Sequence, residues 1–375
     1  MKHDFIHRGA VEQLKSIVKE YNSPKIFLIT GKKSYEESGA ETKISSLLKN
    51  FEVVHFNGFR TNPILSDVLE GIELFNTHHC NIIISVGGGS VIDMGKLINY
   101  FHTVPKPHLI SSQNISNPNF KPKTHIAIPT TAGSGSEATQ FAVLYIGDTK
   151  YSIDHTELKP NYVIIDPNLH HSQTPYQIAV SGADAFAQAV ESYWSINSTS
   201  ESRGYAQKAI QTIWESLPLA FQKNESNAFL KMAEAAHLAG KAINITRTTA
   251  PHALSYAFTS QLGIPHGHAS ALTIPYFLKY NYQVNQNDLN DSRGVAFVKE
   301  RIEEICKFIH ADNIDSAFTK LINFYQKIEI ELSLREMNTP HEQLKHILSR
   351  VNTERMKNNP RKPNFEHLEK YLANN

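Results

Sequence analysis

Cysteine is scarce in this chain, and neither sign of charge is in excess. Only two cysteines, Cys80 and Cys306, occur among 375 residues, which excludes a disulfide framework and a zinc site built from cysteines. The 37 basic and 36 acidic side chains nearly cancel, so the formal net charge is +1. Because nucleic-acid-binding proteins usually carry a clear basic excess, we expect no nucleic-acid partner.

Long apolar runs are also missing. No segment reaches the roughly 20 apolar residues that span a bilayer, and the stretch from Met1 to Tyr21 lacks the apolar core of a signal peptide. We therefore expect no membrane association and, given the few cysteines, a cytoplasmic location. The composition, 41% apolar and 19% charged, is that of a globular protein, and 375 residues suit two domains.

The first part of the chain alternates short apolar runs with helical patterns. Apolar runs bounded by glycine or proline are typical of buried strands, and they occur at residues 25–30, 51–56, 81–86, 125–128, 141–146 and 162–165. Helical patterns lie between them, for example at 64–76 and 90–101. This alternation predicts βαβ units and a mostly parallel sheet.

After Asp166-Pro167 the pattern changes to long stretches of helical period, at residues 175–195, 200–213, 227–245 and 298–309. No convincing strand pattern follows. The sequence therefore predicts an α/β domain over residues 1–172 and an all-α domain over residues 173–375.

One glycine-rich turn connects a predicted strand to a predicted helix and consists of Gly87, Gly88, Gly89 and Ser90. Glycines let the backbone approach a ligand closely, and the amide groups at the start of the following helix attract an anion such as a pyrophosphate. Asp93 and Lys96 lie in the first turns of that helix. A plain strand–helix turn that binds nothing is the alternative.

A second turn, at residues 129–137, follows another predicted strand and contains Thr130, Thr131 and Ser134. Two such turns on one sheet favour a nucleotide-binding domain over two plain connections. Neither turn is the GxGxxG dinucleotide fingerprint, so a standard Rossmann unit is not predicted.

The helical half contains a candidate metal site. Asp184 and Gln188 are four residues apart and share one face of a predicted helix, and two histidines follow, His252 and His266. Oxygen and nitrogen ligands of this kind suit Fe²⁺, Zn²⁺ or Mn²⁺. The alternative is an ordinary helix start and two histidines in ordinary hydrogen bonds, since the chain has 19 histidines.

Together these segments resemble the iron-containing alcohol dehydrogenase family, which shows GGGSxxDxxK, a PTTAGTGSE-like turn, an Asp-Pro, GxDAxxHAxE and Pro-His-Gly in this order. The matching segments are Gly87–Lys96, Pro129–Glu137, Asp166-Pro167, Gly182–Glu191 and Pro265-His266-Gly267. The resemblance implies a dehydroquinate synthase-like fold in two domains. It also implies NAD(P) on the glycine-rich turns, one divalent metal (Fe²⁺ or Zn²⁺) in the helical domain, and a homo-oligomer such as a dimer.

By position, the resemblance assigns the metal ligands to Asp184, Gln188, His252 and His266. Most family members have histidine where this chain has Gln188, although glutamine can ligate through its carbonyl oxygen. A further family histidine, associated with proton transfer, is replaced by Tyr256. Tyr256 is therefore our candidate for the proton relay.

Within the family, residues 183–195 and 239–256 resemble the phosphonoacetaldehyde reductase branch, which converts phosphonoacetaldehyde to 2-hydroxyethylphosphonate. A small anionic aldehyde requires cations near the metal, and Lys241 and Arg247 are the candidates, because arginine matches phosphonate oxygens and lysine adds a point charge. Their convergence needs a helix end near residues 246–249. Otherwise both cations lie on a solvated helix face.

The cofactor preference depends on the end of the first predicted strand, where Gly31 precedes Lys32 and Lys33. NAD-selective relatives often carry an acidic residue there, which binds the ribose hydroxyls. Here no carboxylate repels a 2′-phosphate and two lysines attract it, so we expect NADPH to be preferred to NADH. The alternative is that both lysines are simply solvated.

Three rival functions remain open on the sequence. The first is a general short-chain alcohol or diol dehydrogenase of the same family. The second is a metal-dependent cyclising lyase of the dehydroquinate synthase type, which returns its NAD. The third is a nucleotide-binding protein without catalysis, because Gln188 and Tyr256 depart from the family pattern.

Overall fold

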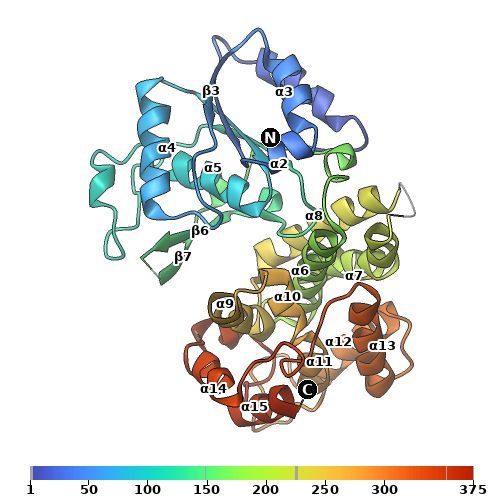
Figure 1. The fold of residues 1–375 in the computed structure, drawn as a ribbon. Coiled ribbons are helices and arrows are strands. Elements are labelled where there is room, and N and C mark those ends of the chain that lie inside the picture. Colours follow the sequence, from blue (N-terminus) through green and yellow to red (C-terminus); the bar gives the residue numbers. More distant parts are fainter. Residues whose placement is uncertain (1–2, 148, 224–226, 352, 375) are drawn as a thin grey trace. The chain divides into compact units, whose positions relative to one another are not determined.

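The computed structural model describes residues 3–147, 149–223, 227–351 and 353–374. The chain divides into two compact units, Met1–Gln173 and Thr174–Asn375 (Figure 1). The first unit contains a parallel sheet and the second is built of helices, so the predicted fold class is confirmed. Within its described residues the second unit has one isolated bridge, between Leu289 and Arg361, and no strand.

Six parallel strands form the main sheet in the order β1-β8-β5-β4-β2-β3. Their bounds are β1 His3–Ile6, β2 Lys25–Thr30, β3 Glu52–Phe56, β4 Ile82–Gly87, β5 Thr124–Pro129 and β8 Tyr162–Ile165. Strands β2, β4, β5 and β8 are buried along almost their whole length. Continuous apolar runs are therefore what the sequence shows for them, as expected when helices cover both faces of a sheet.

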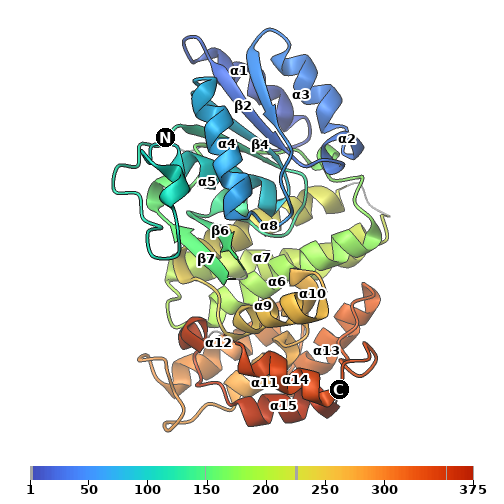
Figure 2. The ribbon, with the colours of Figure 1, turned by 60° about the vertical axis from the view of Figure 1, so that its left-hand side comes forward.

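Alternate residues of these strands enter two separate cores, because successive side chains point to opposite faces. On β2, Phe27 and Ile29 pack with residues of α4 (Leu65–Thr77) and α5 (Gly89–Phe101). Ile26 and Leu28 pack instead with residues of α1 (Gln13–Lys19) and α3 (Ala40–Leu48). Figures 1 and 2 show these two pairs of helices on opposite faces of the sheet.

The strand order contains a switch point between β2 and β4. The chain leaves β2 for β3 on one side and then crosses back to place β4 on the other side. Open parallel sheets bind ligands at such a point, outside the carboxyl ends of the strands. Pairing of Thr30 with Val86, and of Gly87 with Pro129, brings the ends of β2, β4 and β5 to the same edge.

Two strands were not predicted. The four residues of β1 are all exposed or half-buried, and on β7 (Thr149–Asp154) only Ile153 is buried, so neither strand shows a clear apolar pattern. The strand predicted at residues 141–146 is present as β6 (Phe141–Ile146). It belongs to a separate antiparallel hairpin with β7 and not to the parallel sheet.

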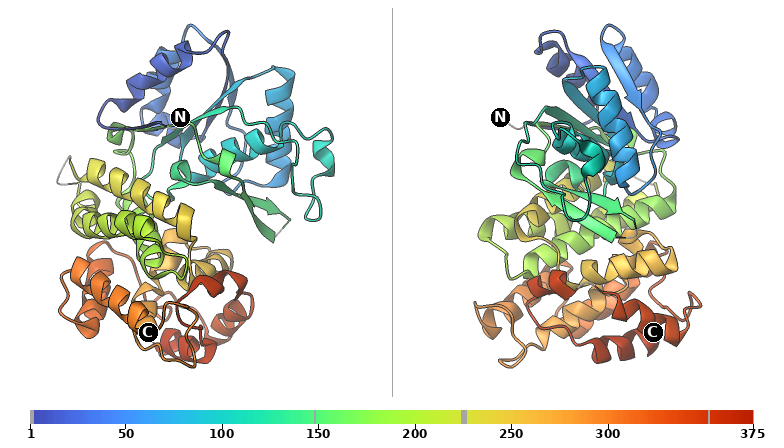
Figure 3. Two further views of the ribbon diagram at one scale, coloured as in Figure 1. Left: turned by 180° about the vertical axis from the view of Figure 1, so that it is seen from behind. Right: turned by 90° about the vertical axis from the view of Figure 1, so that its left-hand side faces the viewer.

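In the second unit, α6 (Pro175–Trp194), α7 (Ser200–Phe221) and α8 (Ala228–Thr246) pack against one another (Figure 3). The short helix α10 (His266–Ala271) packs against both α6 and α9 (Ala250–Leu262). The remaining helices are α2 Ser34–Glu37 in the first unit, and α11 Ile274–Tyr282, α12 Val295–Phe308, α13 Ile314–Lys327, α14 His341–Ser349 and α15 Phe365–Asn374 in the second. Among the helices of the described ranges, none combines the length and the apolar character that crossing a bilayer requires.

Candidate nucleotide and metal sites

The glycine-rich turn after β4 lies at the switch point, and α5 begins at Gly89 directly after it. A Cβ at Gly87 would lie 2.5 Å from a methyl carbon of Val91, and one at Gly89 would lie 2.6 Å from the hydroxyl of Ser134. At Gly88 the same atom would meet nothing closer than 3.5 Å. The packing of the turn therefore requires the outer two glycines, whereas Gly88 leaves room beside the start of α5.

The second turn packs directly against the first. Thr130 donates its backbone N–H to the carbonyl oxygen of Gly87 at 3.1 Å, and Thr131 is the nearest neighbour of a Cβ built at Gly88. The carbonyl oxygen of Thr130 accepts from the side-chain amide of Gln173 at 3.0 Å. The structure thus brings Thr130, Thr131 and Ser134 together with the glycine turn, as a nucleotide site would require.

Asp93 and Lys96 lie inside the first unit and fix the segment that follows the second turn. Asp93 accepts from the hydroxyl of Ser136 at 2.5 Å and from the backbone N–H of Val143 at 3.0 Å. Lys96 is fully buried and donates to the carbonyl oxygens of Ser136 and Phe141 at 2.6 and 2.9 Å. Its burial lowers the pKa of Lys96 to about 8. Their predicted cofactor role is therefore at most indirect: both residues fix the segment beside the candidate nucleotide site.

The other residues predicted for the cofactor lie at the rim of the same edge. Gly31 follows β2 and is half-buried, and the next residue, Lys32, is exposed. The hydroxyl of Ser90 accepts from the backbone N–H of Asn62 at 3.2 Å, which ties the start of α5 to the segment before α4. An exposed lysine at the end of β2 is the position where an adenosine 2′-phosphate would be recognised.

Three helices of the second unit bring metal-ligating atoms together. Asp184 of α6, His252 of α9 and His266 of α10 place a carboxylate oxygen and two imidazole nitrogens within 4.8 Å of one another. Oδ1 of Asp184 lies 3.3 Å from Nε2 of His252 and 4.0 Å from Nε2 of His266. Gln188, one turn further along α6, donates its amide N–H to Oδ2 of Asp184 at 3.1 Å, so its side chain lies at the same point.

This donor set fits a divalent transition metal. Nε2 of His252 is buried and, apart from Oδ1 of Asp184 at 3.3 Å, has no hydrogen-bonding partner in the described ranges. A buried polar atom of this kind costs free energy unless a ligand binds it. Carboxylate and amide oxygens together with imidazole nitrogens are ligands that Fe²⁺ and Zn²⁺ accept.

Glu191, which the sequence did not single out, orients His252. It lies one turn beyond Gln188 on the same face of α6, is fully buried, and contacts Nδ1 of His252 through Oε2. Its Oε1 accepts from the backbone N–H groups of Thr249 at 2.8 Å and His252 at 3.2 Å. Burial alone would lower the pKa of His252, but the carboxylates of Glu191 and Asp184 raise it to about 9. The spacing of 184, 188 and 191 on one helical face was the signal available in the sequence.

His266 is fixed by a close contact between two helices. A Cβ at Gly267 would lie 1.9 Å from the carbonyl oxygen of Val180 and 2.9 Å from Cβ of Asp184, so only glycine lets α10 approach α6 this closely. Nδ1 of His266 also lies 3.1 Å from the hydroxyl of Ser255. Neither contact was predicted, although the Pro-His-Gly motif contains the glycine.

Tyr256 lies beside the metal constellation. Its ring stacks on that of His266, with centroids 4.8 Å apart and planes inclined by 17°. Its hydroxyl oxygen accepts from Nη1 of Arg355 at 3.1 Å. The residue predicted for the proton relay is therefore in direct contact with a histidine of the candidate metal site.

Lys241 lies on α8, and Arg247 is the first residue after that helix. Since α9 begins at Ala250, the helix end that the anion-binding hypothesis requires is present. Arg247 adopts φ 61° and ψ 176°, a conformation almost confined to glycine. Its backbone N–H donates to Ile243 at 2.9 Å and its carbonyl oxygen accepts from the hydroxyl of Thr246 at 2.8 Å. Strained backbone held in this way is often found at ligand-binding sites.

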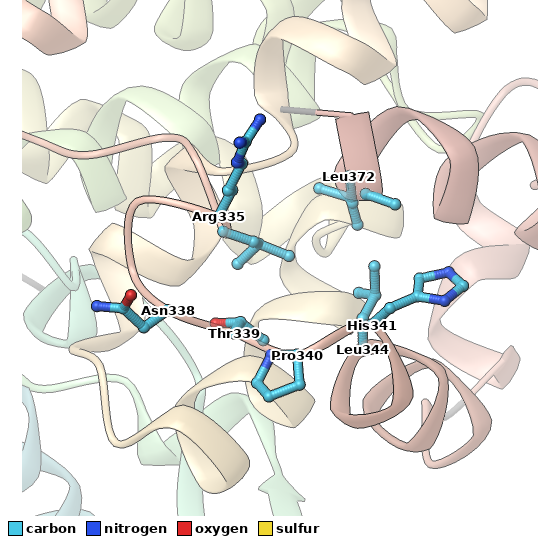
Figure 4. Close-up of a pocket in the computed structure, with 9 residues that line it drawn as sticks. Arg335, Asn338, Thr339, Pro340, His341, Leu344 and Leu372 are labelled. Atoms are coloured by element: carbon cyan, nitrogen blue, oxygen red, sulfur yellow. The ribbon is translucent and has the colours of Figure 1, made fainter.

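A pocket of about 500 Å³ occurs elsewhere in the second unit (Figure 4). Its lining residues are Leu334, Arg335, Asn338, Thr339, Pro340, His341, Leu344, Leu372 and Ala373. None of the metal-ligating residues or the predicted anion-binding residues is among them. We therefore assign this pocket no role at the metal constellation.

Comparison with known proteins identifies the family. Residues 3–167 match the family model for iron-containing alcohol dehydrogenase, and residues 178–375 match the model for the C-terminal part of the same family. The chain belongs to the iron-containing alcohol dehydrogenase family. This family member is thus an oxidoreductase, and a nicotinamide dinucleotide and a divalent metal both fit the two sites described above.

Relatives of this iron-containing alcohol dehydrogenase include long-chain-alcohol dehydrogenase 1 of Geobacillus thermodenitrificans, 31% identical over 72% of this chain and 70% of the relative. Phosphonoacetaldehyde reductase of Streptomyces viridochromogenes is 31% identical over 60% of this chain and 59% of its own length. Among solved structures, sulfoacetaldehyde reductase from Bifidobacterium kashiwanohense in complex with NAD⁺ superposes with a TM-score of 0.85 at 26% identity, covering 99% of this chain and 97% of the other.

Proposed function

We propose that this protein uses NAD(P)H and one divalent metal to reduce a small aldehyde with an anionic substituent, phosphonoacetaldehyde, to its alcohol. The observation that carries the proposal is the convergence of Asp184, His252 and His266 within 4.8 Å, with Gln188 bonded to the same carboxylate. A nucleotide turn at the switch point of the sheet supports the cofactor half of the proposal.

Each group of residues has a defined task in this reaction. When bound by Asp184, Gln188, His252 and His266, a divalent Fe²⁺ or Zn²⁺ supplies a Lewis acid for the aldehyde oxygen. Glu191 holds the ring of His252 so that Nε2 faces the ligand position. The turns at Gly88 and Thr130 hold the dinucleotide that delivers hydride. Tyr256, or water, returns a proton to the product oxygen.

Lys241 and Arg247 are the residues proposed to bind the anionic substituent of the aldehyde. Arg247 lies in the turn between α8 and α9 that precedes His252. Because its backbone leaves the helical conformation there, its side chain points in a different direction from that of a residue that continued α8. A guanidinium binds two oxygens of a phosphonate or a sulfonate at once. The resemblance to reductases of both phosphonoacetaldehyde and sulfoacetaldehyde supports this assignment.

NADPH is the proposed preferred cofactor, with NADH as a second choice. Lys32 and Lys33 are both exposed at the end of β2, and neither Gly31 nor its neighbours provide a carboxylate that would exclude a 2′-phosphate. Sulfoacetaldehyde reductase from Bifidobacterium kashiwanohense, one relative of known structure, was solved in complex with NAD⁺, so a comparison of both cofactors decides this point.

The deciding experiment measures NADPH oxidation by metal-loaded enzyme with phosphonoacetaldehyde, sulfoacetaldehyde and propanal. We expect kcat/KM for an anionic aldehyde to exceed that for propanal by about tenfold or more, since a charged hydrogen bond contributes at least that factor. Equal values would leave a general short-chain alcohol dehydrogenase. Turnover without net consumption of NADPH would point to the cyclising lyase, and no turnover of any of the three aldehydes would contradict the proposed reaction.

A further inference from the structure

An arginine far along the chain, Arg355, contacts the Tyr256 ring beside the metal constellation. The Tyr256 ring lies on His266, and the guanidinium carbon of Arg355 lies 4.9 Å from the centroid of the same Tyr256 ring. Nη1 of Arg355 also donates to the Tyr256 hydroxyl at 3.1 Å. The Tyr256 ring therefore contacts both a permanent cation and a histidine of the candidate metal site.

This cation has no acidic partner among the described residues. Glu354, its neighbour in the chain, instead pairs with Lys357 at 2.6 Å. The contacts that Arg355 makes in the described part of the chain are with Tyr256, and they use the ring face and Nη1. Arg355 is half-buried, and within the described residues no ion pair or hydrogen bond is found for its Nε and Nη2 groups. A partly buried guanidinium of this kind favours an anion at its remaining donors.

The segment that carries Arg355 is tied to the turn that carries Arg247. Arg355 lies in a short 3-10 helix, Thr353–Asn358. Asn358 at its end donates to the carbonyl oxygen of Thr248 at 3.2 Å, and Asn197 bridges the carbonyl of Thr246 and the side chain of Asn358 at 3.3 and 3.0 Å. The segments that carry Arg247 and Arg355 are therefore fastened to each other, and Arg355 reaches His266 through Tyr256.

We propose that Arg355 is a specificity-determining residue that binds the phosphonate or sulfonate group of the substrate together with Arg247. Tyr256 positions it through its ring and through its hydroxyl, which accepts from Nη1, and Nε and Nη2 are then left for two oxygens of the anion. The inference rests on the proposed function, and it assigns substrate recognition to a residue outside the family motifs.

The test compares Arg355→Met and Arg355→Lys with the wild type, and uses Arg335→Met as a matched control because Arg335 is exposed at the rim of the separate pocket (Figure 4). Two quantities are measured in metal-loaded enzyme: kcat and KM for phosphonoacetaldehyde and propanal, and the inhibition constant of methylphosphonate against propanal. For Arg355→Met we expect KM for phosphonoacetaldehyde and the inhibition constant to rise about tenfold or more relative to Arg335→Met. Because the contact with Tyr256 is also lost, kcat for both aldehydes should fall by the same smaller factor, so the anion effect appears in KM and in the inhibition constant. Arg355→Lys should recover part of the loss.

Two results overturn the assignment of Arg355. One is an equal loss of kcat/KM for propanal and phosphonoacetaldehyde, which would show only that Arg355 supports the fold around Tyr256. The other is an unchanged preference for the anion in Arg355→Met, which would leave the proposed function standing with another anion site. Absence of any anion preference in the wild type is the separate result that overturns the proposed function, and with it this inference.

Discussion

At the scale of single residues, Glu191 shows how a side chain outside the ligand set shapes a metal site. It is fully buried, and its carboxylate is divided between Nδ1 of His252 and the backbone N–H groups of the turn before α9. Carboxylates that hold a ligating histidine fix the ring orientation and raise the basicity of the ligand. In this chain the carboxylate of Glu191 therefore fixes both the turn before α9 and the ring orientation of His252.

Replacing Glu191 by Gln should weaken metal binding by about 10- to 100-fold, because the amide nitrogen would face Nδ1 of His252 in place of a carboxylate oxygen. The measurement is competition for Zn²⁺ against a chelating indicator, with Glu215→Gln on the exposed side of α7 as control. If Glu191→Gln binds Zn²⁺ as tightly as the wild type, the carboxylate stabilises only the turn before α9 and does not support His252.

Arg247 permits a prediction about backbone strain. At φ 61° and ψ 176° every residue other than glycine is strained, so Arg247→Gly should be more stable than Arg247→Ala. We expect a difference of about 1 kcal/mol after allowing for the extra conformational entropy of glycine. Urea unfolding of the two variants measures it, and a more stable alanine variant would mean that the turn relaxes to an ordinary conformation.

At the scale of elements, the glycine turn after β4 contains one glycine that packing does not require, so ligand binding can be changed there without changing stability. Gly88 has φ −75°, and a Cβ there would be in ordinary contact with Thr131 at 3.5 Å, so Gly88→Ala should fold normally. Its methyl group would nevertheless occupy the space in front of the first amides of α5. We expect the dissociation constant for NADPH to rise about tenfold or more with an unchanged melting temperature, because each lost contact to a phosphate costs at least this factor.

Fluorescence titration with NADPH and thermal unfolding measure the two effects in the same preparations. A matched comparison is Gly89→Ala, whose Cβ would lie 2.6 Å from the Ser134 hydroxyl and should lower stability as well. Normal NADPH affinity in the Gly88 variant would place the phosphates elsewhere.

The sequence predicted the elements whose burial is continuous and missed those whose burial is partial. Strands β4, β5 and β8 are buried on both faces, and their apolar runs identified them. The edge strand β1 and the hairpin strand β7 mix polar and apolar residues, so periodicity carried no signal there. The separate hairpin followed from pairing between β6 and β7, which a single sequence does not show.

The residues of the candidate site also fall into those that the sequence predicted and those that it did not. Asp184 and Gln188 lie four residues apart on one helix, and spacing alone relates them. Contacts such as Arg355 on Tyr256, or Ser255 beside His266, depend on how separate helices pack, and no local pattern encodes them. The family resemblance supplied His252 and His266 as partners of Asp184, and it was confirmed by the family models that match both halves of the chain.

At the scale of the whole molecule, the residues proposed for each ligand fall within a single compact unit. The glycine-rich turns belong to Met1–Gln173 and the metal constellation to Thr174–Asn375. In calorimetry, Zn²⁺ should therefore raise the unfolding temperature of the second unit, and NADPH that of the first. At 100 times its dissociation constant a ligand adds ~2.7 kcal/mol, which corresponds to an upward shift of roughly 5–10 °C.

At the same ligand concentrations, Glu191→Gln should reduce the shift caused by Zn²⁺ to about half or less and leave the shift caused by NADPH, and Gly88→Ala should do the opposite. These two variants assign the transitions without a truncated chain. Loss of both shifts in either variant would mean that the two ligands share one cooperative unit.

Gly267 has a consequence for how the protein acquires its metal. The distance between α6 and α10 is set by backbone atoms in contact, not by side chains that can rearrange. Asp184 and His266 are consequently held in place by the fold itself, and an arriving ion meets a template that is already shaped. The rate of metal uptake by the apoprotein should then depend on how fast the ion loses its water ligands and His252 loses its proton, because the chain itself needs little rearrangement.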